Sequence, residues 1–273
     1  MISNYLKIFS IVFLLTFSNE AKSKNTNNNE FNSRELSNYL SGIIALDNEN
    51  NEESLKYFRS SKNLKNKHSE YFKKYILSLV LNQDVKRAIQ EIKIQNNKNK
   101  TDYFEFNLMM AIDNFQKKNY DKSTLYLEKM IKYKNLGTFE AIIYESLKSY
   151  FYAFENKKIL KQKSNYKNLE DLNLTFIKCY LRDDKTAEYF EGLINSTTVD
   201  YSRYLFFYIS HLIDSKNLYN IEKISKNIDE YNSTLLILQS KMWLEKNKLE
   251  NFQKIFSCNR ENDILAEFFF LIA

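Results

Sequence analysis

Side chains that could do acid–base, nucleophilic or metal chemistry are few in this sequence. There are two histidines, His68 and His211, and two cysteines, Cys179 and Cys258. His211 precedes Asp214 by about one helical turn, but no Gly-x-Ser-x-Gly motif supplies a nucleophile. The sequence also lacks a glycine-rich phosphate loop, a His-Glu-x-x-His motif and a calcium-binding loop. These residue types predict no catalytic residue, no metal site and no cofactor, and they favour a structural role for His211.

The two cysteines are far apart in the sequence and do not form a Cys-x-x-Cys motif. Their spacing therefore indicates neither a zinc site nor a disulfide framework. Two interpretations stay open: they are two separate buried thiols, or they form one bridge in an oxidising compartment.

The first residues of the chain bear on that compartment. Lys7 precedes an apolar run over 8–17, and a polar segment with the small residues of Ala21-Lys22-Ser23 follows. This layout is typical of a secretory signal peptide. The alternative is an uncleaved anchor, but the apolar run is shorter than the ~20 residues of a membrane-spanning helix. We expect residues 1–23 to be a signal peptide, 24–34 to be flexible, and the mature chain to have no stable membrane span.

Composition favours helices over strands. The 273 residues include no proline and only three glycines, residues that tight turns and strand connections usually need. The net charge is +6, but charges of both signs are scattered, and no long basic run marks a nucleic-acid-binding arm. We therefore expect an all-α protein with solvated charged faces that binds no nucleic acid.

A small or modest residue followed four places later by a larger apolar one recurs along the chain. The clear copies are Ser54/Phe58, Ala88/Ile92, Ser123/Leu127 and Thr186/Phe190, and the weaker ones are Asn220/Ile224 and Phe252/Phe256. Successive copies lie 34, 35, 63, 34 and 32 residues apart, and the long step leaves room for a degenerate copy within 137–166. A small side chain lets two helices approach, and the large one fills the adjoining gap. A period of about 34 residues indicates an array of helical repeats.

The pattern resembles the tetratricopeptide repeat family. The stretch NYDKSTLYLEKMIK (119–132) is similar to the second helix of that repeat, and YLSGIIALDNENNEESLKYF (39–58) to a first helix, turn and second helix. In the latter, Gly42 and Ser54 stand at the small positions and Phe58 at the aromatic one. The resemblance implies a right-handed superhelical solenoid of antiparallel helix pairs over residues 35–273. Its repeats would span about 35–66, 69–100, 102–134, 137–166, 167–198, 200–231 and 232–259.

Local signals mark helix ends in this scheme. Asn32-x-x-Glu35 and Asp102-x-x-Glu105 have the spacing of N-terminal capping pairs, and NQD (82–84) and RDD (182–184) break the helical pattern inside repeats. The last residues, DILAEFFFLIA, begin another first helix. Because a solenoid needs a polar capping face at each end, we expect the array to continue beyond residue 273. The alternative is a terminal helix that packs elsewhere.

The resemblance implies a non-enzymatic scaffold that binds other proteins in a concave groove lined by the first helix of each repeat. The groove positions of the first three repeats would be Tyr39, Ile43, Leu46, Lys73, Leu77, Leu81, Leu108, Ile112 and Phe115. Leu77 stands where the family's carboxylate clamp has an asparagine. The mostly apolar set favours an amphipathic helix or an extended apolar peptide. The alternative is that these side chains pack within their own helix pairs.

The leader and the repeats together predict an exported scaffold, in the periplasm of a bacterial envelope, that binds an unidentified protein or peptide. A second hypothesis is the helical superstructure of a larger envelope enzyme, similar to a lytic transglycosylase, with its catalytic domain beyond residue 273. A nucleic-acid-binding array is disfavoured by the export signal and the lack of a basic stripe. Further repeats beyond residue 273 would support the scaffold, and a compact domain with a catalytic glutamate would support the enzyme.

Overall fold

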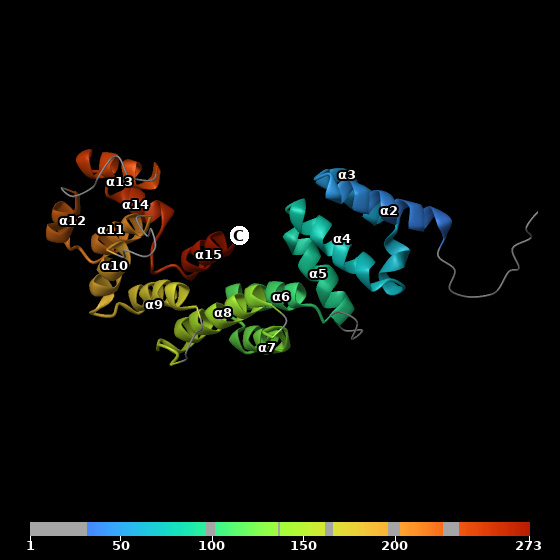
Figure 1. The fold of residues 1–273 in the computed structure, drawn as a ribbon, viewed down its shortest axis with the longest axis horizontal. Helices are drawn as coiled ribbons and strands as arrows, with labels where there is room; N and C mark the ends of the chain where they lie inside the picture. Colours follow the sequence, from blue (N-terminus) through green and yellow to red (C-terminus); the bar gives the residue numbers. More distant parts are fainter. Residues whose placement is uncertain (1–31, 97–101, 136, 162–165, 196–202, 226–234) are drawn as a thin grey trace, which may run out of the picture. The chain divides into compact units, whose positions relative to one another are not determined.

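The computed structural model describes residues 32–96, 102–135, 137–161, 166–195, 203–225 and 235–273 (Figure 1). All regular secondary structure in these ranges is helical, which confirms the all-α prediction. No helix in this part of the chain combines the length and apolar character needed to cross a membrane. The predicted signal peptide lies outside the described residues, as does most of the predicted flexible segment. The chain divides into two compact units, unit 1 over Met1–Val85 and unit 2 over Lys86–Ala273.

Unit 1 is organised around buried aromatic rings. Its described elements are α2 (Ser33–Asp47), α3 (Asn51–Ser60), the 3-10 helix η1 (Lys62–Asn66) and α4 (Ser69–Leu81). Helix α3 packs against both α2 and α4. Phe58 of α3 is fully buried there, with its ring centre 6.0 Å from that of Tyr71 and 6.1 Å from that of Tyr39. Burying these rings supplies the main apolar stabilisation of unit 1.

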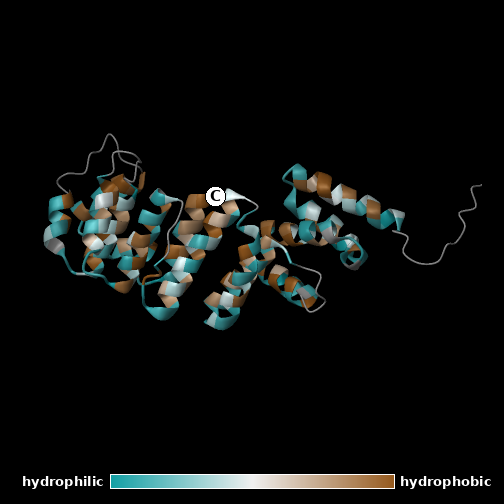
Figure 2. Ribbon diagram, turned by 60° about the horizontal axis from the view of Figure 1, so that its bottom comes forward, coloured by the Kyte–Doolittle hydropathy of each residue, from teal (hydrophilic) through white to brown (hydrophobic). Residues whose placement is uncertain are grey.

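Unit 2 continues as a succession of helices. They are α5 (Val85–Asn96), whose first residue ends unit 1, α6 (Phe104–Gln116), α7 (Tyr120–Met130), η2 (Ile131–Tyr133), α8 (Thr138–Asn156), α9 (Lys167–Leu181), α10 (Thr186–Ile194), α11 (Tyr204–Asp214), α12 (Leu218–Ser225), α13 (Leu235–Glu245), α14 (Glu250–Ile255) and α15 (Glu261–Ile272). Consecutive helices from α6 to α12 pack on one another, and α11 also contacts α13 and α14. Figure 2 shows apolar and polar residues alternating along the helices, as expected when each helix buries one face.

The core of unit 2 is contiguous and rich in aromatic residues. Phe115 of α6 stacks on Phe151 of α8 with 4.3 Å between ring centres. Farther along the chain, Phe207 of α11 meets Phe256 edge to face, also at 4.3 Å. Aromatic pairs at such distances add to the free energy gained from area burial alone. The core therefore links helices that are distant in the sequence.

Two helix pairs share one close-packing arrangement. In unit 1, the hydroxyl of Ser54 on α3 donates a hydrogen bond to the carbonyl oxygen of Gly42 on α2, at 3.0 Å. In unit 2, Ser123 on α7 donates the equivalent bond to Ala111 on α6, at 2.8 Å. Donor and acceptor are 12 residues apart in both pairs. The serines are small because the backbone of the preceding helix lies against them, as the periodicity predicted.

Six turns between successive helices in the described part of the chain share one backbone geometry. Each contains a non-glycine residue in the left-handed region, with φ between 50° and 62°. These residues are Glu49, Gln83, Lys118, Arg182, Lys216 and Asn247. The backbone amide of the next residue bonds a carbonyl five residues back in the preceding helix, as in Asn50 to Ala45 and Asp84 to Leu79. This closure satisfies helix-end carbonyls without glycine, so the scarcity of glycine is compatible with tight turns.

The predicted helix ends are correct in three places and wrong in one. Asn32 caps α2 by accepting from the amide of Arg34 at 2.9 Å, and the NQD and RDD stretches separate α4 from α5 and α9 from α10. The predicted cap at Asp102 is wrong, because α6 has Tyr103 at its N-cap and no side-chain cap bond. The Asp102 carboxylate instead accepts from Asn107 at 2.9 Å and from Lys132.

Two segments depart from the regular pattern. The expected degenerate repeat contains the 19-residue helix α8, and the described residues that follow it, up to 161, are not helical. Near the chain end, α15 packs on the rest of unit 2. Phe268 is fully buried with its ring centre 5.8 Å from that of Tyr150, and Glu267 makes a bidentate ion pair with Arg203 at 2.8 Å.

Candidate functional site

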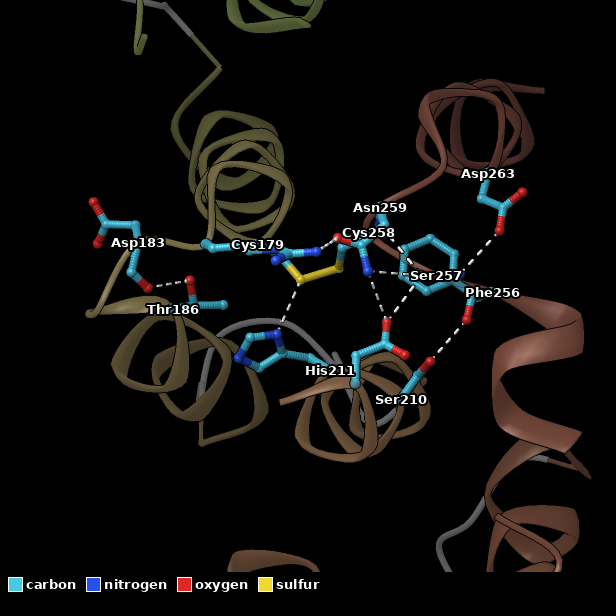
Figure 3. Close-up of a disulfide and its surroundings, with 12 residues drawn as sticks. Cys179, Asp183, Thr186, Ser210, His211, Phe256, Ser257, Cys258, Asn259 and Asp263 are labelled. Carbon is cyan, nitrogen blue, oxygen red and sulfur yellow. Dashed lines mark hydrogen bonds between the residues drawn. A yellow bond between two sulfur atoms is a disulfide. The ribbon is translucent and has the colours of Figure 1, made fainter. Parts of the chain in front are cut away.

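The candidate site consists of a disulfide in unit 2 and the histidine and carboxylate side chains around it (Figure 3). Cys179, in the last turn of α9, is bonded to Cys258 in the segment between α14 and α15, with 5.6 Å between the Cα atoms. The two cysteines are 79 residues apart in the sequence. Both sulfur-bearing residues are buried. The structure thus decides between the two interpretations of the cysteines in favour of a bridge.

His211 of α11 lies against this bridge. Its Nδ1 is 3.4 Å from the sulfur of Cys179, and its ring is stacked near Phe190 at 5.9 Å between centres. Burial lowers the pKa of His211, because the imidazolium loses hydration, while the nearby Asp214 carboxylate opposes that shift. The imidazole is therefore neutral at pH 7 and packs as a flat, weakly polar group.

Asp214, at the end of α11, gathers the polar contacts of the bridge region. One carboxylate oxygen accepts from Gln253 at 2.6 Å, and the other accepts from Ser257 at 2.9 Å and Asn259 at 3.3 Å. Ser210, one turn earlier on α11, donates to the carbonyl oxygen of Phe256 at 2.7 Å. The segment that carries Cys258 is thus held to α11 by several hydrogen bonds as well as to α9 by the bridge.

A cavity of about 380 Å³ opens beside the bridge. Its lining includes both cysteines, Arg182, Asp183, Asp184, His211, Asp214 and Asn259. Among the described residues, no cluster of histidine, cysteine, aspartate and glutamate has an arrangement that could hold a metal ion. Lys178 stabilises the ionised form of Asp183 through a hydrogen bond and lowers the pKa of that carboxyl. The groups around the cavity bond mainly to each other, so the arrangement holds helices together and offers no aligned nucleophile and base.

The nine predicted groove residues divide into three sets by exposure. Tyr39 and Phe115 are buried, with exposed fractions of 7% and 2%, and their rings pack in the cores of their own units. Leu77 and Leu81 of α4 are exposed at 42% and 45%. The others are half-buried: Ile43, Leu46, Lys73, Leu108 and Ile112. For Leu108 and Ile112 this partial burial comes from packing against the core of unit 2.

Sequence reasoning missed an exposed apolar stripe on α2. Leu36, Leu40 and Ile44 have exposed fractions of 42%, 51% and 61%. Their spacing of four residues places them on one face of the helix. That spacing is visible in the sequence, but the repeat alignment directed attention to Tyr39, Ile43 and Leu46 instead. The stripe would have been found by asking which apolar positions the core does not need.

His68 has the structural role expected of a turn residue. It stands at the N-cap of α4, and its Nδ1 accepts a hydrogen bond from the amide of Tyr71 at 3.0 Å. A histidine ring nitrogen here replaces the serine or aspartate oxygen that more commonly caps helices.

Comparisons of this chain with protein-family models, with curated proteins and with solved structures find no match.

Proposed function

We propose that this chain is an exported, non-enzymatic scaffold of tetratricopeptide-like helix pairs that binds an apolar protein segment. The observation that carries the proposal is the recurrence of one hairpin geometry. Ser54 and Ser123 donate to carbonyl oxygens 12 residues back, and the two donors are separated by about two repeat lengths. A unit that repeats its packing at a fixed period stacks into an elongated array, which we propose to be a right-handed superhelix.

The surface that supports binding lies on the first helix of the second repeat. Leu77 and Leu81 are successive positions on one face of α4, and both are more than two-fifths exposed. Half-buried Lys73 lies on the same face, one turn before Leu77. Large apolar side chains exposed in a row indicate an interaction surface, because leaving them in water costs free energy. Leu77 and Leu81 together suit an amphipathic helix or an extended apolar peptide.

Export is supported by two independent features. The N-terminal layout is typical of a signal peptide. The Cys179–Cys258 bridge is of the kind that persists in oxidising compartments such as the periplasm, and is rare in the reducing cytosol. Expressed in a bacterium with a suitable export system, the chain is expected to lose residues 1–23 and to accumulate in the envelope. Intact mass of the purified protein checks the cleavage, and a product that retains Met1 would contradict it.

The binding surface is tested by site-specific cross-linking in cells. A photo-reactive residue at Leu77 should capture a discrete partner in the envelope. The matched control is Leu125 on α7, a second helix, where the side chain is 51% exposed and stands outside the predicted groove. Leu77→Ser combined with Leu81→Ser should abolish capture from a probe at Lys73 while changing the melting temperature little. Equal capture at Leu77 and Leu125, or a large loss of stability in the double variant, would rule out this surface.

A further inference from the structure

The outward face of α2 is apolar although it belongs to the first described helix of the chain. Leu36, Leu40 and Ile44 are all more than two-fifths exposed. The neighbouring helix α3 shows the opposite pattern, since its exposed side chains include Glu52, Glu53, Lys56 and Arg59. Exposed apolar residues are ordinary when scattered, but three in a line on one helix indicate a surface that is covered by another molecule.

The residues on this face have a symmetric order. From one end of α2 to the other they are Ser33, Leu36, Leu40, Ile44 and Asp47, which we call the α2 stripe. The steps between them are 3, 4, 4 and 3 residues, so the stripe reads with the same spacing from either end, and Leu40 is its midpoint. Apolar positions spaced three and four residues apart form the seam along which two helices pack side by side.

We propose that the α2 stripe is the interface of a homodimer, in which α2 of a second copy packs antiparallel on it. A two-fold axis passes beside Leu40. Leu40 then meets Leu40 of the partner subunit, and Leu36 meets Ile44 of the partner subunit. An interface on a two-fold axis must be complementary to itself, and a stripe with this symmetry satisfies that requirement without any second surface.

The charges at the two ends of α2 favour the antiparallel arrangement. Asp47 is exposed at the C-terminal end, and Arg34 is exposed at the N-terminal end. Neither side chain has an ion pair within the described part of the chain. Antiparallel packing brings Asp47 to the first turn of the partner's α2, where free backbone amides and the helix dipole attract a carboxylate, and where the partner's Arg34 also lies. A parallel pair would instead place two Asp47 carboxylates side by side.

The interface is small, which sets the strength of the expected dimer. One pair of short helices buries less than the total of about 1,200 Å² that marks stable complexes. We therefore expect a monomer–dimer equilibrium with a dissociation constant on the order of micromolar. The dimer does not depend on the proposed peptide groove, because Leu77 and Leu81 are not in the stripe.

Sedimentation of the full chain over a range of concentrations tests the proposal. The wild type should shift from monomer to dimer and form nothing larger. Leu40→Glu brings two carboxylates together on the axis and should raise the dissociation constant at least about 30-fold, as expected for a central interface residue. Leu125→Glu is the matched control, because Leu125 has the same exposed fraction of 51% on a different helix, and it should leave the equilibrium unchanged.

A cysteine cross-link tests the geometry. Leu40→Cys should form a covalent dimer on mild oxidation, because only a residue beside the axis meets its own copy, whereas Leu125→Cys should not. Asp47→Lys should weaken the dimer about threefold, as expected for reversing a charge near a helix N-terminus. A chain that stays monomeric at all concentrations overturns the proposal. Open-ended assembly that Phe270→Glu disrupts would also overturn it, because that result indicates head-to-tail contacts. A dimer whose dissociation constant does not change in Leu40→Glu would overturn it as well.

Discussion

The α2–α3 hairpin of unit 1 and the region from α11 to α15 of unit 2 hold their helices together by different means. In α2–α3, the Ser54 hydroxyl bonds the Gly42 carbonyl, and the Phe58 ring fills the space beside the glycine. In the later region, Phe252 stands where the predicted repeat has a small residue, and its ring stacks on Phe206 at 5.1 Å. A disulfide and the contacts of Asp214 then connect the helices.

The two regions differ in the size and chemistry of one side chain. A serine allows the next helix to approach until a hydroxyl reaches a backbone carbonyl, so the hairpin is held by contacts within about 12–16 residues. The Phe252 side chain offers no hydroxyl for such a bond. The Cys179–Cys258 bridge and the hydrogen bonds of Asp214 instead join segments that are far apart in the sequence. The α2–α3 hairpin should therefore tolerate reduction of the bridge, and the region from α11 to α15 should not.

The largest expected effect comes from removing the bridge. Cys258→Ala removes the bridge and should lower the free energy of unfolding of unit 2 by about 4.5 kcal/mol. The bridge closes a loop between residues 79 apart, and a closed loop of this length strongly restricts the unfolded chain. Guanidinium unfolding followed by hydrogen exchange checks it. Protection in α11–α15 should fall, and protection in α2–α4 should not. Equal loss of protection in both regions would mean that the bridge does not stabilise α11–α15 selectively.

Phe58→Ala should destabilise unit 1 and leave the region around the bridge in unit 2 unaffected. The ring is fully buried between helices of unit 1, and its loss should cost about 4 kcal/mol, typical of a phenylalanine truncated in a core. Hydrogen exchange should speed up in α2–α4 and remain unchanged near the bridge. A cost below ~1 kcal/mol would mean that the site is not close-packed.

Alanine substitutions at two of the glycines should change the stability by smaller amounts and in opposite directions. A methyl group at Gly42 would lie 3.1 Å from the Phe58 ring, whereas at Gly192 of α10 nothing lies within 4 Å. Gly42→Ala should therefore cost about 1 kcal/mol, since the gain in helix propensity is outweighed by overpacking. Gly192→Ala should instead stabilise the chain by about 0.5–1 kcal/mol. Thermal melts of the two single variants show the direction of each change in stability. A stabilising effect of Gly42→Ala would show that the α2–α3 hairpin is loosely packed.

The two regions also differ in how far their structure could be predicted from the sequence. The helical character and several of the turns between helices were predictable, because hydrophobic periodicity and turn residues are local signals in the sequence. The Cys179–Cys258 pairing was not, because residues 79 apart carry no local signal of contact. Tyr39 illustrates a finer limit. Its position matched a groove site of the repeat, yet its ring packs among Phe58, His68 and Tyr71, because neighbouring aromatic residues offer it a buried environment.

The smallest expected effect is a dependence on pH near the bridge. The pKa of His211 is lower in the folded chain than its ordinary value because of burial. The unfolded chain therefore binds a proton at His211 more tightly than the folded chain does. As a result, the free energy of unfolding is undiminished above about pH 6.5 and decreases as pH falls below that value. His211→Gln should flatten the change in melting temperature between about pH 7.5 and pH 5.5. An unchanged pH profile would mean that His211 does not titrate differently in the two states.

The most direct test of the account is a peptide map of the protein isolated from the envelope, with free thiols alkylated before any reduction. A single cross-linked pair of peptides that contains Cys179 and Cys258 is expected, because the region from α11 to α15 depends on this covalent link. Two alkylated cysteines and no linked peptide would contradict it, since the region from α11 to α15 would then hold together without the bridge.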